Sequence, residues 1–541
     1  MSTFNLADLF ELVVDVVPQR EAIVTAERRL TYAELDERAN RFANHLLAAG
    51  IQYSDHVGLE LLNGTEYLEA MLGCYKARAA SINVNYRYVK SDLAYLFDDA
   101  DLVGLVYHRQ FGPRVAAAAA ELPKLSHFVV VDDGSGADAV PGSIDYEAAL
   151  TAAGPERPAV GERTADDHYV AYTGGTTGMP KGVVWRQEDI FFAAMGGGDP
   201  AQSGNPVSRP EELAERVQDV GLVSLHTPPL MHVSAQWGAL IDLLRGGKVV
   251  LSPQGRFDAD AIWALVGAEK VNVMTIVGDA MARPLIDALA VAGAAGRPFD
   301  VSSLLAIGSG GAVLSSASKA RIGELLPDVI VVDAFGSSET GLMGSRAGAV
   351  SGPAGGSGFT VNEHVMVLGN EGRPVEPGSG VVGRLARRGR VPLGYYKDEA
   401  KTESTFMLVD GVRWVLSGDM ATVDSDGTVV MLGRGSTSIN TGGEKVYPEE
   451  VEVVLRAHPD VDDAVVVGVI DDQWGERVVA VVQPRAGAKL ELQDVQEFCR
   501  KELAGYKVPR QLCLVGQLLR SPTGKPDYRW ARDTATGVVT G

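Results

Sequence analysis

The sequence predicts an α/β protein with a large N-terminal domain, in which helices flank β-sheets, and a small α+β C-terminal domain. Short apolar runs alternate with helical patterns through the middle of the chain, and several end in glycine-rich turns: KVVLS, VNVMTIVG, LLAIGSGG and VIVVDAFG. Such runs are typical of α/β units whose ligand loops follow the strands. The pattern changes after GRGS (433–436), so we expect one domain over residues 1–433 and a second over 434–541.

Early in the chain, a capping signal predicts an amphipathic helix. Thr31 is followed three residues later by Glu34, as in a capping box. Apolar residues then recur at helical spacing up to Gly50, namely Leu35, Ala39, Phe42 and Leu46. Further along, MATVDSDGTVVMLGRG indicates a β-hairpin that turns on Asp426 and Gly427.

The sequence of residues 434–541 predicts a compact α+β fold. VYPEEVEVVLRAHPDV predicts a helix with Pro448 near its start and two acidic residues in its first turn. The runs DAVVVGVI and RVVAVVQPR predict strands, and LQDVQEFCRKELAG predicts another helix.

Composition excludes several classes of protein. The formal net charge is -21, which repels phosphate backbones and anionic lipid headgroups, so we expect no nucleic-acid partner. Cys74, Cys499 and Cys513 have no metal-ligand spacing and are typical of reduced thiols. The N-terminus has no basic start, and no run of 18 apolar residues occurs, so we expect neither a signal peptide nor a membrane span. A cytoplasmic location is expected.

The segment VAYTGGTTGMPKGVVW (170–185) is the strongest local signal. Lys181 is preceded by Pro180 and followed by Gly182, whereas a Walker A loop needs Ser or Thr directly after Gly-Lys. Its glycines nevertheless permit close backbone approach to an anion, and its threonines and lysine can bind phosphate. The sequence therefore predicts a phosphate loop of a different kind.

The segment YTGGTTGMPKG resembles the signature loop of the adenylate-forming (ANL) superfamily, which contains acyl-CoA synthetases, luciferases and peptide-synthetase adenylation domains. Further segments follow in the order of that family: GSGGAVL, DAFGSSETG, SGDM, GRGSTSINTGGEKVYPEEVE, GYKVP and SPTGKPDYR. The resemblance covers nearly the whole chain. It implies an N-terminal AMP-binding (adenylation) domain and a mobile C-terminal lid domain that carries a catalytic lysine.

The resemblance also implies the chemistry. A carboxylate attacks the α-phosphorus of Mg-ATP to give an acyl-adenylate and pyrophosphate, and a thiol, usually that of CoA, then displaces AMP. Because the first step brings two anions together, neutralisation of charge must dominate catalysis. The implied cofactors are therefore ATP, Mg²⁺ and CoA.

Residue roles follow from the matching motifs. The resemblance assigns the β- and γ-phosphates to Thr173, Gly174, Gly175, Thr176, Thr177 and Lys181. It assigns the rest of the nucleotide to Gly310, Gly311, Ala312, Asp333, Phe335, Gly336, Ser337, Ser338, Asp419 and Arg434. Among these, Asp333 accepts from the adenine amino group, and Asp419 binds both ribose hydroxyls. Phe335 stands where tyrosine is commoner, and Ser338 where threonine is usual.

Three residues are implied as catalytic. Glu339 resembles the Mg²⁺ ligand, a hard oxygen donor for a hard cation. Lys525 resembles the lysine that bridges the substrate carboxylate and the α-phosphate. His232, in PPLMHVSAQW, matches a histidine at the acyl pocket.

One position departs from the family. Two residues after Gly433-Arg434, Ser436 stands at the hinge where Asp or Lys is common. A small polar residue beside Gly435 can still absorb a dihedral change. The lid is then expected to present Lys525 for adenylation and to rotate, so that the 439–445 loop with Gly442 and Gly443 lines the path of the thiol.

The substrate is inferred by resemblance. The stretch MHVS lacks the aspartate that amino-acid-activating relatives use, and no acyl-carrier domain is expected after Lys525, which favours CoA as the acceptor. GDAMARPL (278–285) and SINTGGEKVYPEEVE most resemble actinobacterial ligases for long-chain fatty acids and steroid side-chain acids. An acyl-AMP ligase that does not use CoA, a phosphoryl-transfer NTPase and a non-catalytic nucleotide-binding homologue stay open as alternatives, and so does a homodimer.

Overall fold

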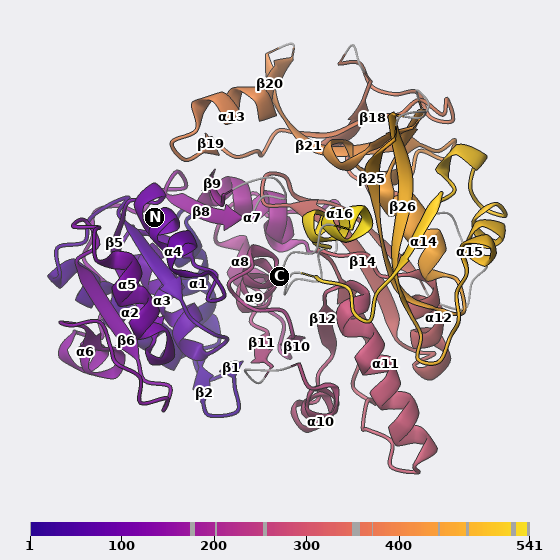
Figure 1. The fold of residues 1–541 in the computed structure, drawn as a ribbon. Helices are drawn as coiled ribbons and strands as arrows, with labels where there is room; N and C mark the ends of the chain where they lie inside the picture. Colours follow the sequence, from indigo (N-terminus) through magenta and orange to yellow (C-terminus); the bar gives the residue numbers. More distant parts are fainter. Residues whose placement is uncertain are drawn as a thin grey trace.

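The computed structural model describes residues 2–173, 179–200, 203–252, 257–348, 358–369, 372–409, 411–441, 444–471, 475–520 and 526–537. Three sheets organise these residues, with helices packed against them (Figure 1). The fold class is α/β, as the sequence predicts, with a large N-terminal part and a small C-terminal part.

The helices are α1 (Leu6–Val16), α2 (Tyr32–Ala48), α3 (Thr65–Lys76), α4 (Lys90–Asp99), α5 (Gly112–Ala119), α6 (Tyr146–Ala152), α7 (Gln187–Met195), α8 (Glu212–Glu215), α9 (Val233–Leu243), α10 (Ala259–Glu269), α11 (Gly278–Ala294), α12 (Ser316–Leu325), α13 (Glu399–Thr405), α14 (Pro448–Arg456), α15 (Leu492–Cys499) and α16 (Tyr528–Thr536).

The largest sheet contains β1 (Glu21–Val24), β2 (Arg29–Thr31), β10 (Val223–His226), β11 (Lys248–Leu251), β12 (Val273–Ile276), β13 (Ala306–Ser309), β14 (Ile330–Ser337), β15 (Gly341–Gly348), β16 (Gly358–Val361), β17 (Val365–Leu368), β18 (Gly383–Arg388), β20 (Phe406–Val409), β21 (Val412–Val423) and β22 (Val429–Arg434). The second contains β3 (His56–Glu60), β4 (Ala80–Asn83), β5 (Leu102–His108), β6 (His127–Val131), β7 (Ile144–Asp145), β8 (His168–Thr173), β9 (Lys181–Arg186) and β19 (Gly394–Tyr395). The third contains β23 (Ile439–Thr441), β24 (Glu444–Val446), β25 (Val461–Asp471), β26 (Gly475–Pro484) and β27 (Gln511–Leu514).

The four apolar runs that the sequence analysis singled out form β11, β12, β13 and β14 of the largest sheet. Neighbouring strands in the order β11-β10-β12-β13-β14 pair in parallel. Parallel strands point their carboxyl ends to one edge, so the segments that follow β13 and β14 emerge beside each other. Both segments belong to the predicted nucleotide site.

Helix α2 confirms the predicted capping signal. Thr31 Oγ1 accepts from the Glu34 backbone N–H at 3.2 Å, and Glu34 Oε2 accepts from the Thr31 N–H at 2.7 Å. The apolar stripe of this helix is fully buried, comprising Leu35, Ala39, Phe42 and Leu46. A Cβ on Gly73 of α3 would lie 2.8 Å from Phe42 Cδ1, so glycine lets the two helices approach closely. Each buried side chain of Leu or Phe size contributes about 1.5–3 kcal/mol.

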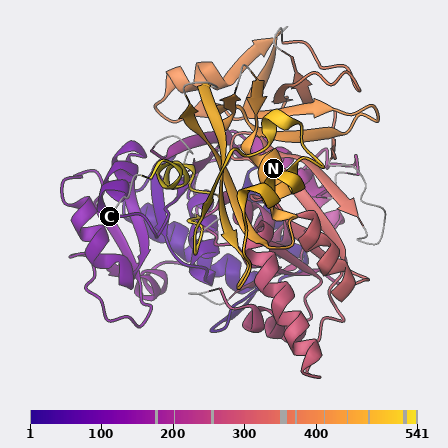
Figure 2. The same cartoon turned by 45° about the vertical axis from the view of Figure 1, so that its right-hand side comes forward.

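The predicted hairpin and the predicted C-terminal unit are also present. β21 and β22 pair antiparallel around a turn in which Gly427 has a φ of +85°. In the third sheet, alternate valines of β25 and β26 point to opposite faces, as the period of two residues in a strand requires. One face packs with α14 and α15, and the other with α16 (Figure 2).

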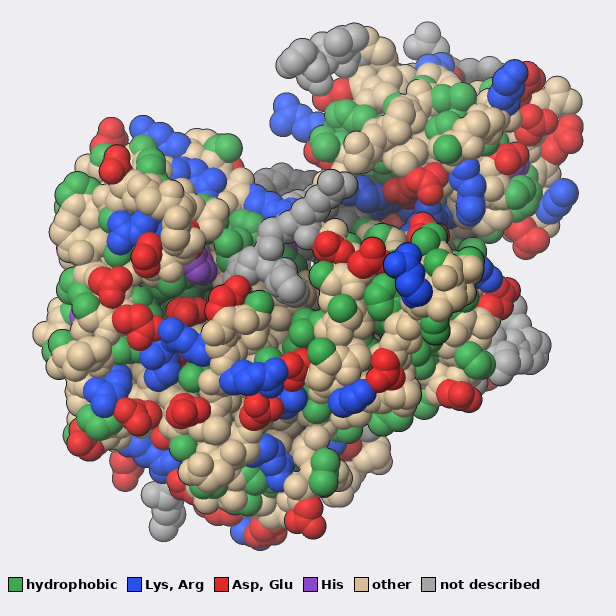
Figure 3. Space-filling view, turned by 90° about the horizontal axis from the view of Figure 1, so that it is seen from below, with side chains coloured by type: hydrophobic (Ala, Val, Ile, Leu, Met, Phe, Trp, Pro, Cys, Tyr) green, Lys and Arg blue, Asp and Glu red, His purple; other side chains and the backbone are tan. Residues whose placement is uncertain are grey.

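Two features of the structure concern binding to charged partners and to membranes: the distribution of surface charge and the length of the helices. On the face shown in Figure 3, acidic and basic side chains are interspersed among the described residues, and the face is hollowed between two lobes. Within the part of the chain that the structure describes, no helix is long and apolar enough to cross a bilayer.

Candidate active site

The predicted phosphate loop leaves the end of the β8–β9 hairpin. Thr173 and Lys181 are the last antiparallel pair at the loop end of this hairpin, so the loop begins and ends at neighbouring residues. The predicted phosphate ligands Gly174, Gly175, Thr176 and Thr177 lie outside the described residues.

Lys181 has a partner that the sequence analysis missed. Its Nζ donates to Oδ2 of Asp398, and this ion pair is partly exposed. The hydrogen bond from Lys181, with one from the Lys401 backbone, holds the pKa of Asp398 below its ordinary value. Asp398 also caps α13, because its Oδ1 accepts from the Lys401 N–H at 2.9 Å. No role was predicted for Asp398 from the sequence, because Asp398 lies outside the motifs that indicated the site.

The segment GSSETG forms the turn of the β14–β15 hairpin. The backbone N–H of Ser337 donates to Thr340 Oγ1 at 3.0 Å, and Ser338 and Glu339 form the tip. Gly336 has no room for a side chain, because a Cβ there would lie 2.1 Å from the carbonyl oxygen of Gly341. The hairpin therefore fixes where the Glu339 carboxylate emerges.

Two sheets meet at this turn. Trp185, on β9 of the second sheet, donates from Nε1 to the carbonyl oxygen of Ser338 at 2.8 Å. Tyr395, on β19 of the same sheet, donates from its hydroxyl to Glu339 Oε1 at 3.0 Å. β19 pairs with β9 just after Lys181. Segment 394–398 therefore contacts both Lys181 and Glu339, the two charged groups predicted to bind the triphosphate and its metal.

The predicted adenine turn follows β13. Gly311 has a φ of +79°, a conformation that favours glycine. Asp333, on the next strand, lies beside Ser309 in register. Lys319 of α12 donates from Nζ to Asp333 Oδ2 at 2.5 Å, a contact that the sequence did not reveal. Whether Asp333 accepts from adenine stays a prediction.

Phe335 keeps an aromatic face at the predicted stacking position. Its ring lies 4.7 Å from that of Phe359, measured between centroids, in an edge-to-face arrangement. That geometry suits the aromatic quadrupole and fixes the plane of the Phe335 ring.

The two predicted ribose residues are neighbours. Asp419 on β21 pairs with Arg434 on β22. The backbone N–H of Asp419 donates to Ser417 Oγ at 3.1 Å. Only the backbone of Arg434 and of Ser436 is described.

His232 stands at the N-terminal end of α9. The preceding loop is tied to β8, because Asn83 donates from Nδ2 to the carbonyl oxygens of Tyr172 and Met231, each at 2.8 Å. His232 therefore follows a residue, Met231, that is tied through Asn83 to the strand leading into the phosphate loop, and its role at an acyl pocket stays a prediction.

The remaining predicted residues lie outside the described part of the chain: Gly442, Gly443 and Lys525. The flanks of segment 521–525 are described. Arg520 and Pro526 form an antiparallel bridge across it, and Arg520 makes two hydrogen bonds to Asp463, of 2.6 and 2.8 Å. Burial opposes ionisation of Asp463, but the Arg520 guanidinium prevails and lowers its pKa.

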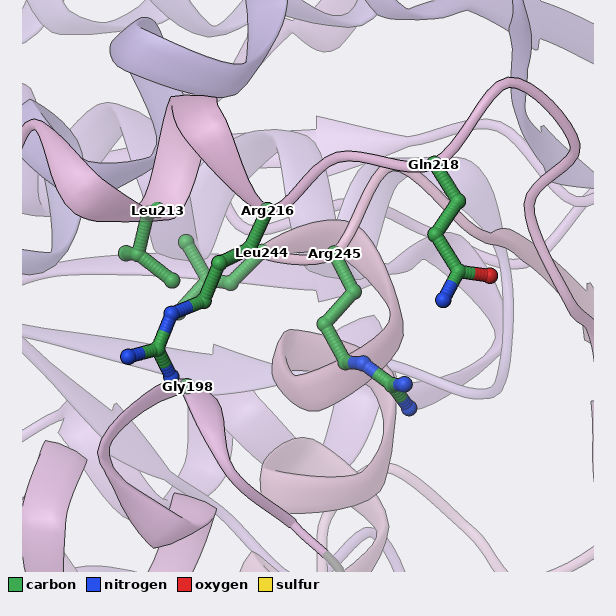
Figure 4. A pocket seen from close by; sticks show the side chains of 6 residues that line it. All are labelled: Gly198, Leu213, Arg216, Gln218, Leu244 and Arg245. Atoms are coloured by element: carbon green, nitrogen blue, oxygen red, sulfur yellow. The ribbon is translucent and has the colours of Figure 1, made fainter. Parts of the chain in front are cut away.

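A separate pocket lies at the other end of α9 (Figure 4). It is lined by Gly198, Leu213, Arg216, Gln218, Leu244 and Arg245. The helix is 11 residues long and lies between His232 and Leu244, so this pocket is about 18 Å along the axis from His232. The two arginine guanidinium groups lie on opposite sides of it, and Arg216 already donates to the Asn205 carbonyl oxygen at 2.6 Å. The pocket is not part of the predicted site.

No group of three or more His, Cys, Asp or Glu side chains suited to a metal ion occurs in the described ranges. A lone Glu339 fits Mg²⁺, which usually takes one or two protein carboxylates and fills its other positions with phosphate oxygens and water.

Comparison with curated proteins shows similarity along the whole chain. It is 48% identical over 535 residues to a 3-oxocholest-4-en-26-oate--CoA ligase from Rhodococcus rhodochrous, covering 98% of this chain and 95% of that protein. It is 47% identical over 532 residues to a medium/long-chain-fatty-acid--CoA/3-oxocholest-4-en-26-oate--CoA ligase from Mycolicibacterium smegmatis, covering 98% and 96%.

Solved structures share the fold. The anthranilate CoA ligase AuaEII in complex with anthranoyl-AMP has a TM-score of 0.84 at 23% identity, covering 99% of this chain and 98% of that one. MatB from Rhodopseudomonas palustris, at 25% identity and 98% coverage of both chains, gives a TM-score of 0.81 in its ATP-bound form and 0.72 in its apo form.

Two family models match the chain. The model of the AMP-binding enzymes matches residues 10–396, and that of the AMP-binding enzyme C-terminal domain matches residues 450–525. The first contains the β8–β9 hairpin, the β14–β15 turn and β19, and the second ends at Lys525. The chain belongs to the AMP-binding enzyme family.

Proposed function

We propose that this protein is an ATP-dependent acyl-CoA ligase, which converts a carboxylic acid, ATP and CoA to acyl-CoA, AMP and pyrophosphate through an acyl-adenylate. The observation that carries the proposal is the junction at segment 394–398. There Lys181, at the base of the phosphate loop, and Glu339 are both held from one short segment. A cation for phosphate oxygens and a carboxylate for Mg²⁺ are what attack on the α-phosphorus needs.

The residue roles are part of this proposal. Thr173 and Lys181 bind the outer phosphates, Glu339 binds Mg²⁺, and Lys525 approaches the α-phosphate from the C-terminal domain. Mg²⁺, when bound, neutralises phosphate charge. The chain's own contribution is to orient these groups, because Trp185 and Tyr395 hold the Ser338-Glu339 turn against the second sheet.

The proposed substrate is a medium- or long-chain fatty acid or a steroid side-chain acid. Support comes from the names of the two curated relatives, both of which are CoA ligases for such acids. The absence of a carboxylate in the sequence MHVS, at the start of α9, argues against an amino-acid substrate, because nothing there would pair with an ammonium group.

The domain boundary between residues 433 and 434 is also proposed. Strands up to β22 belong to the first two sheets, and strands from β23 onward belong to the third. A short 3₁₀ helix at Gly435–Thr437 lies between them, where a change of backbone dihedral angles would rotate one part against the other.

The test is a product analysis with purified protein, MgATP, CoA and a panel of short-, medium- and long-chain fatty acids and steroid-derived acids. We expect AMP and acyl-CoA in equal amounts, with the highest kcat/KM among long-chain or steroid acids. Release of ADP would show a phosphoryl-transfer NTPase instead. AMP-forming activation with no thioester would show an acyl-AMP ligase, and no nucleotide turnover with any acid would contradict an enzymatic role.

A further inference from the structure

An ion pair joins the N-terminal and C-terminal parts of the molecule. Arg283, on α11, donates from Nη1 to Oδ1 of Asp462, just before the buried stretch of β25, at 3.1 Å. The side chains are 25% and 41% exposed, so the pair is only partly screened by water. In both ribbon views the C-terminal part lies beside α11, α12 and β14 (Figures 1 and 2).

On the N-terminal side, Arg283 is connected to the predicted adenine turn. Its Nη2 lies 3.3 Å from Oδ2 of Asp279, one helical turn earlier. The other oxygen of Asp279 accepts from the Ser315 backbone N–H at 2.9 Å, and the Asp279 N–H donates to the Val313 carbonyl oxygen at 3.1 Å. The segment that follows Gly310–Ala312 is therefore held by the residue that also orients Arg283.

On the C-terminal side, Asp462 is connected to the flank of the segment that carries Lys525. Its Oδ2 accepts from Gln483 Nε2 at 2.6 Å, and Gln483 Oε1 accepts from the Leu518 N–H at 2.9 Å. The next residue, Asp463, binds the Arg520 guanidinium. Two consecutive aspartates thus face two ways, one to the N-terminal domain and one to the base of segment 521–525.

A β-bulge explains how the side chains of the adjacent residues Asp462 and Asp463 can point in different directions. The register of β25 against β26 shifts between Val461 and Asp463, so Asp462 is the extra residue of a β-bulge. A bulge bends the strand and changes the direction of a side chain. The bulge lets Asp462 reach Arg283 while Asp463 points to Arg520.

The whole-chain similarity to MatB differs between two solved forms of that enzyme. Along the whole chain, the similarity to MatB is higher for the ATP-bound form than for the apo form of the same enzyme, as reported above. The Arg283–Asp462 contact thus occurs in a structure that is more similar, over the whole chain, to the ATP-bound form than to the apo form.

We propose that the Arg283–Asp462 ion pair holds the C-terminal domain in the orientation used for adenylation, and that Arg283 and Asp462 are positioning residues for that half-reaction. Through Asp279, the pair is connected to the predicted adenine turn. Through Gln483, it is connected to Leu518, which lies just before segment 521–525. It has no role in the second half-reaction, for which the C-terminal domain turns away. The proposal rests on the proposed function, because it concerns one of its two half-reactions.

The experiment separates the half-reactions. Arg283→Gln, Asp462→Asn and the double variant are compared with the unmodified protein in two assays. One measures pyrophosphate release from MgATP and acid without CoA, and the other measures thioester formation from supplied acyl-AMP and CoA. Arg321→Gln is the matched control, because Arg321 on α12 pairs with Glu324 of its own helix.

We expect each single variant to lose about two- to fivefold in adenylation, as partly exposed ion pairs do, with thioester formation unchanged or faster. The double variant should lose no more than either single one, because both substitutions remove the same interaction. The control should match the unmodified protein in both assays.

Three outcomes would overturn the proposal: equal loss in both half-reactions, no loss in adenylation, or additive losses in the double variant. The melting temperature of each variant shows whether that variant is folded. If Arg283→Gln is unfolded, Asp462→Asn decides the test, because its side chain is the more exposed of the two and its substitution disturbs packing less. If the unmodified protein makes neither acyl-AMP nor thioester, the proposed function fails, which is distinct from failure of the ion-pair proposal.

Discussion

The hydroxyl of Tyr395 donates a hydrogen bond to Oε1 of Glu339 at 3.0 Å, and this contact joins two sheets at the candidate active site. Tyr395 belongs to the second sheet and Glu339 to a hairpin turn of the largest one. A bond to one carboxylate oxygen fixes the plane of the carboxylate, so the proposed metal ligand is oriented before any nucleotide binds.

Tyr395→Phe should therefore weaken Mg²⁺ use more than substrate binding. Loss of one hydrogen bond of about 1 kcal/mol would raise the Mg²⁺ concentration for half-maximal activity about fivefold, with the KM for the acid unchanged. Glu339→Ala should raise it further. Titration of activity and of Mn²⁺ binding, followed by electron paramagnetic resonance, checks both variants. An unchanged metal dependence in Tyr395→Phe would remove the positioning role.

Asp398→Asn should lower the KM for MgATP. Asp398 holds Lys181 and carries a negative charge beside the phosphate loop, so it competes with the incoming phosphate. For a partly exposed pair the change is about two- to fivefold. Steady-state kinetics measure it, with Asp300→Asn as the control, because Asp300 pairs with Lys270 at a distant exposed site. A higher KM would show that Asp398 presents Lys181 to the phosphate instead.

Gly336→Ala should reduce activity about 100-fold by displacing the Ser338-Glu339 turn. The added Cβ would lie 2.1 Å from a backbone oxygen, so the backbone must move, and shifts of about 1 Å at reacting groups cost about that much. Gly161→Ala is the control, since nothing lies within 4 Å of a Cβ there. Equal kcat/KM values for both variants would contradict the claim that the backbone at Gly336 fixes the position of the Ser338-Glu339 turn.

Lys525→Ala should abolish acyl-AMP formation but leave thioester formation from supplied acyl-AMP intact. The reason is that Lys525 offsets the repulsion between the substrate carboxylate and the α-phosphate, whereas in the second step the thiolate attacks the acyl carbon of an acyl-adenylate that is already formed and AMP leaves. Single-turnover assays of each half-reaction measure the difference. Equal loss of both would contradict the role proposed for Lys525.

Stability should fall as the pH falls below about 6.5. His45 of α2 and His127 of β6 lie with their Nε2 atoms 3.0 Å apart. Burial, and then repulsion from His127, lower the pKa of His45 to about 4. The unfolded chain, with a histidine pKa of about 6.5, then binds more protons between these values, so protonation favours unfolding.

The measurement is the urea midpoint between pH 7.5 and 4.5, for the unmodified protein and for His45→Gln. The variant should lose less stability as the pH falls, because it lacks one histidine whose pKa is lowered in the folded protein. His127→Gln should act in the same direction, since burial lowers the pKa of His127 too. Identical slopes for all three proteins would contradict the contribution of this pair.

Local pattern was enough to predict several helices and strands. The capping box at Thr31, the turn at Gly427 and the four strands β11, β12, β13 and β14 were predictable because each depends on residues close together in sequence. GSSETG shows where local reasoning is ambiguous. Serines before Glu339 can equally start a helix, and only pairing of β14 with β15 makes this segment a hairpin turn.

The partners of the site residues were not predictable. Asp398 and Tyr395 lie outside every motif that indicated the site. Their contacts with Lys181 and Glu339 span 217 and 56 residues of sequence. No periodicity or spacing encodes such contacts, because they arise only when β19 adds to the edge of β9.

The sequence by itself determined the α/β class, the change of pattern near residue 434 and the motif order that indicates an AMP-binding enzyme, since these depend on residue type and local spacing. Only the tertiary structure decided which charges meet. It brings Tyr395 to Glu339, and Arg283 to Asp462 across the two domains. The physical reason is that sheet pairing and domain packing set the distances between remote side chains, and electrostatic and hydrogen-bond energies depend on those distances.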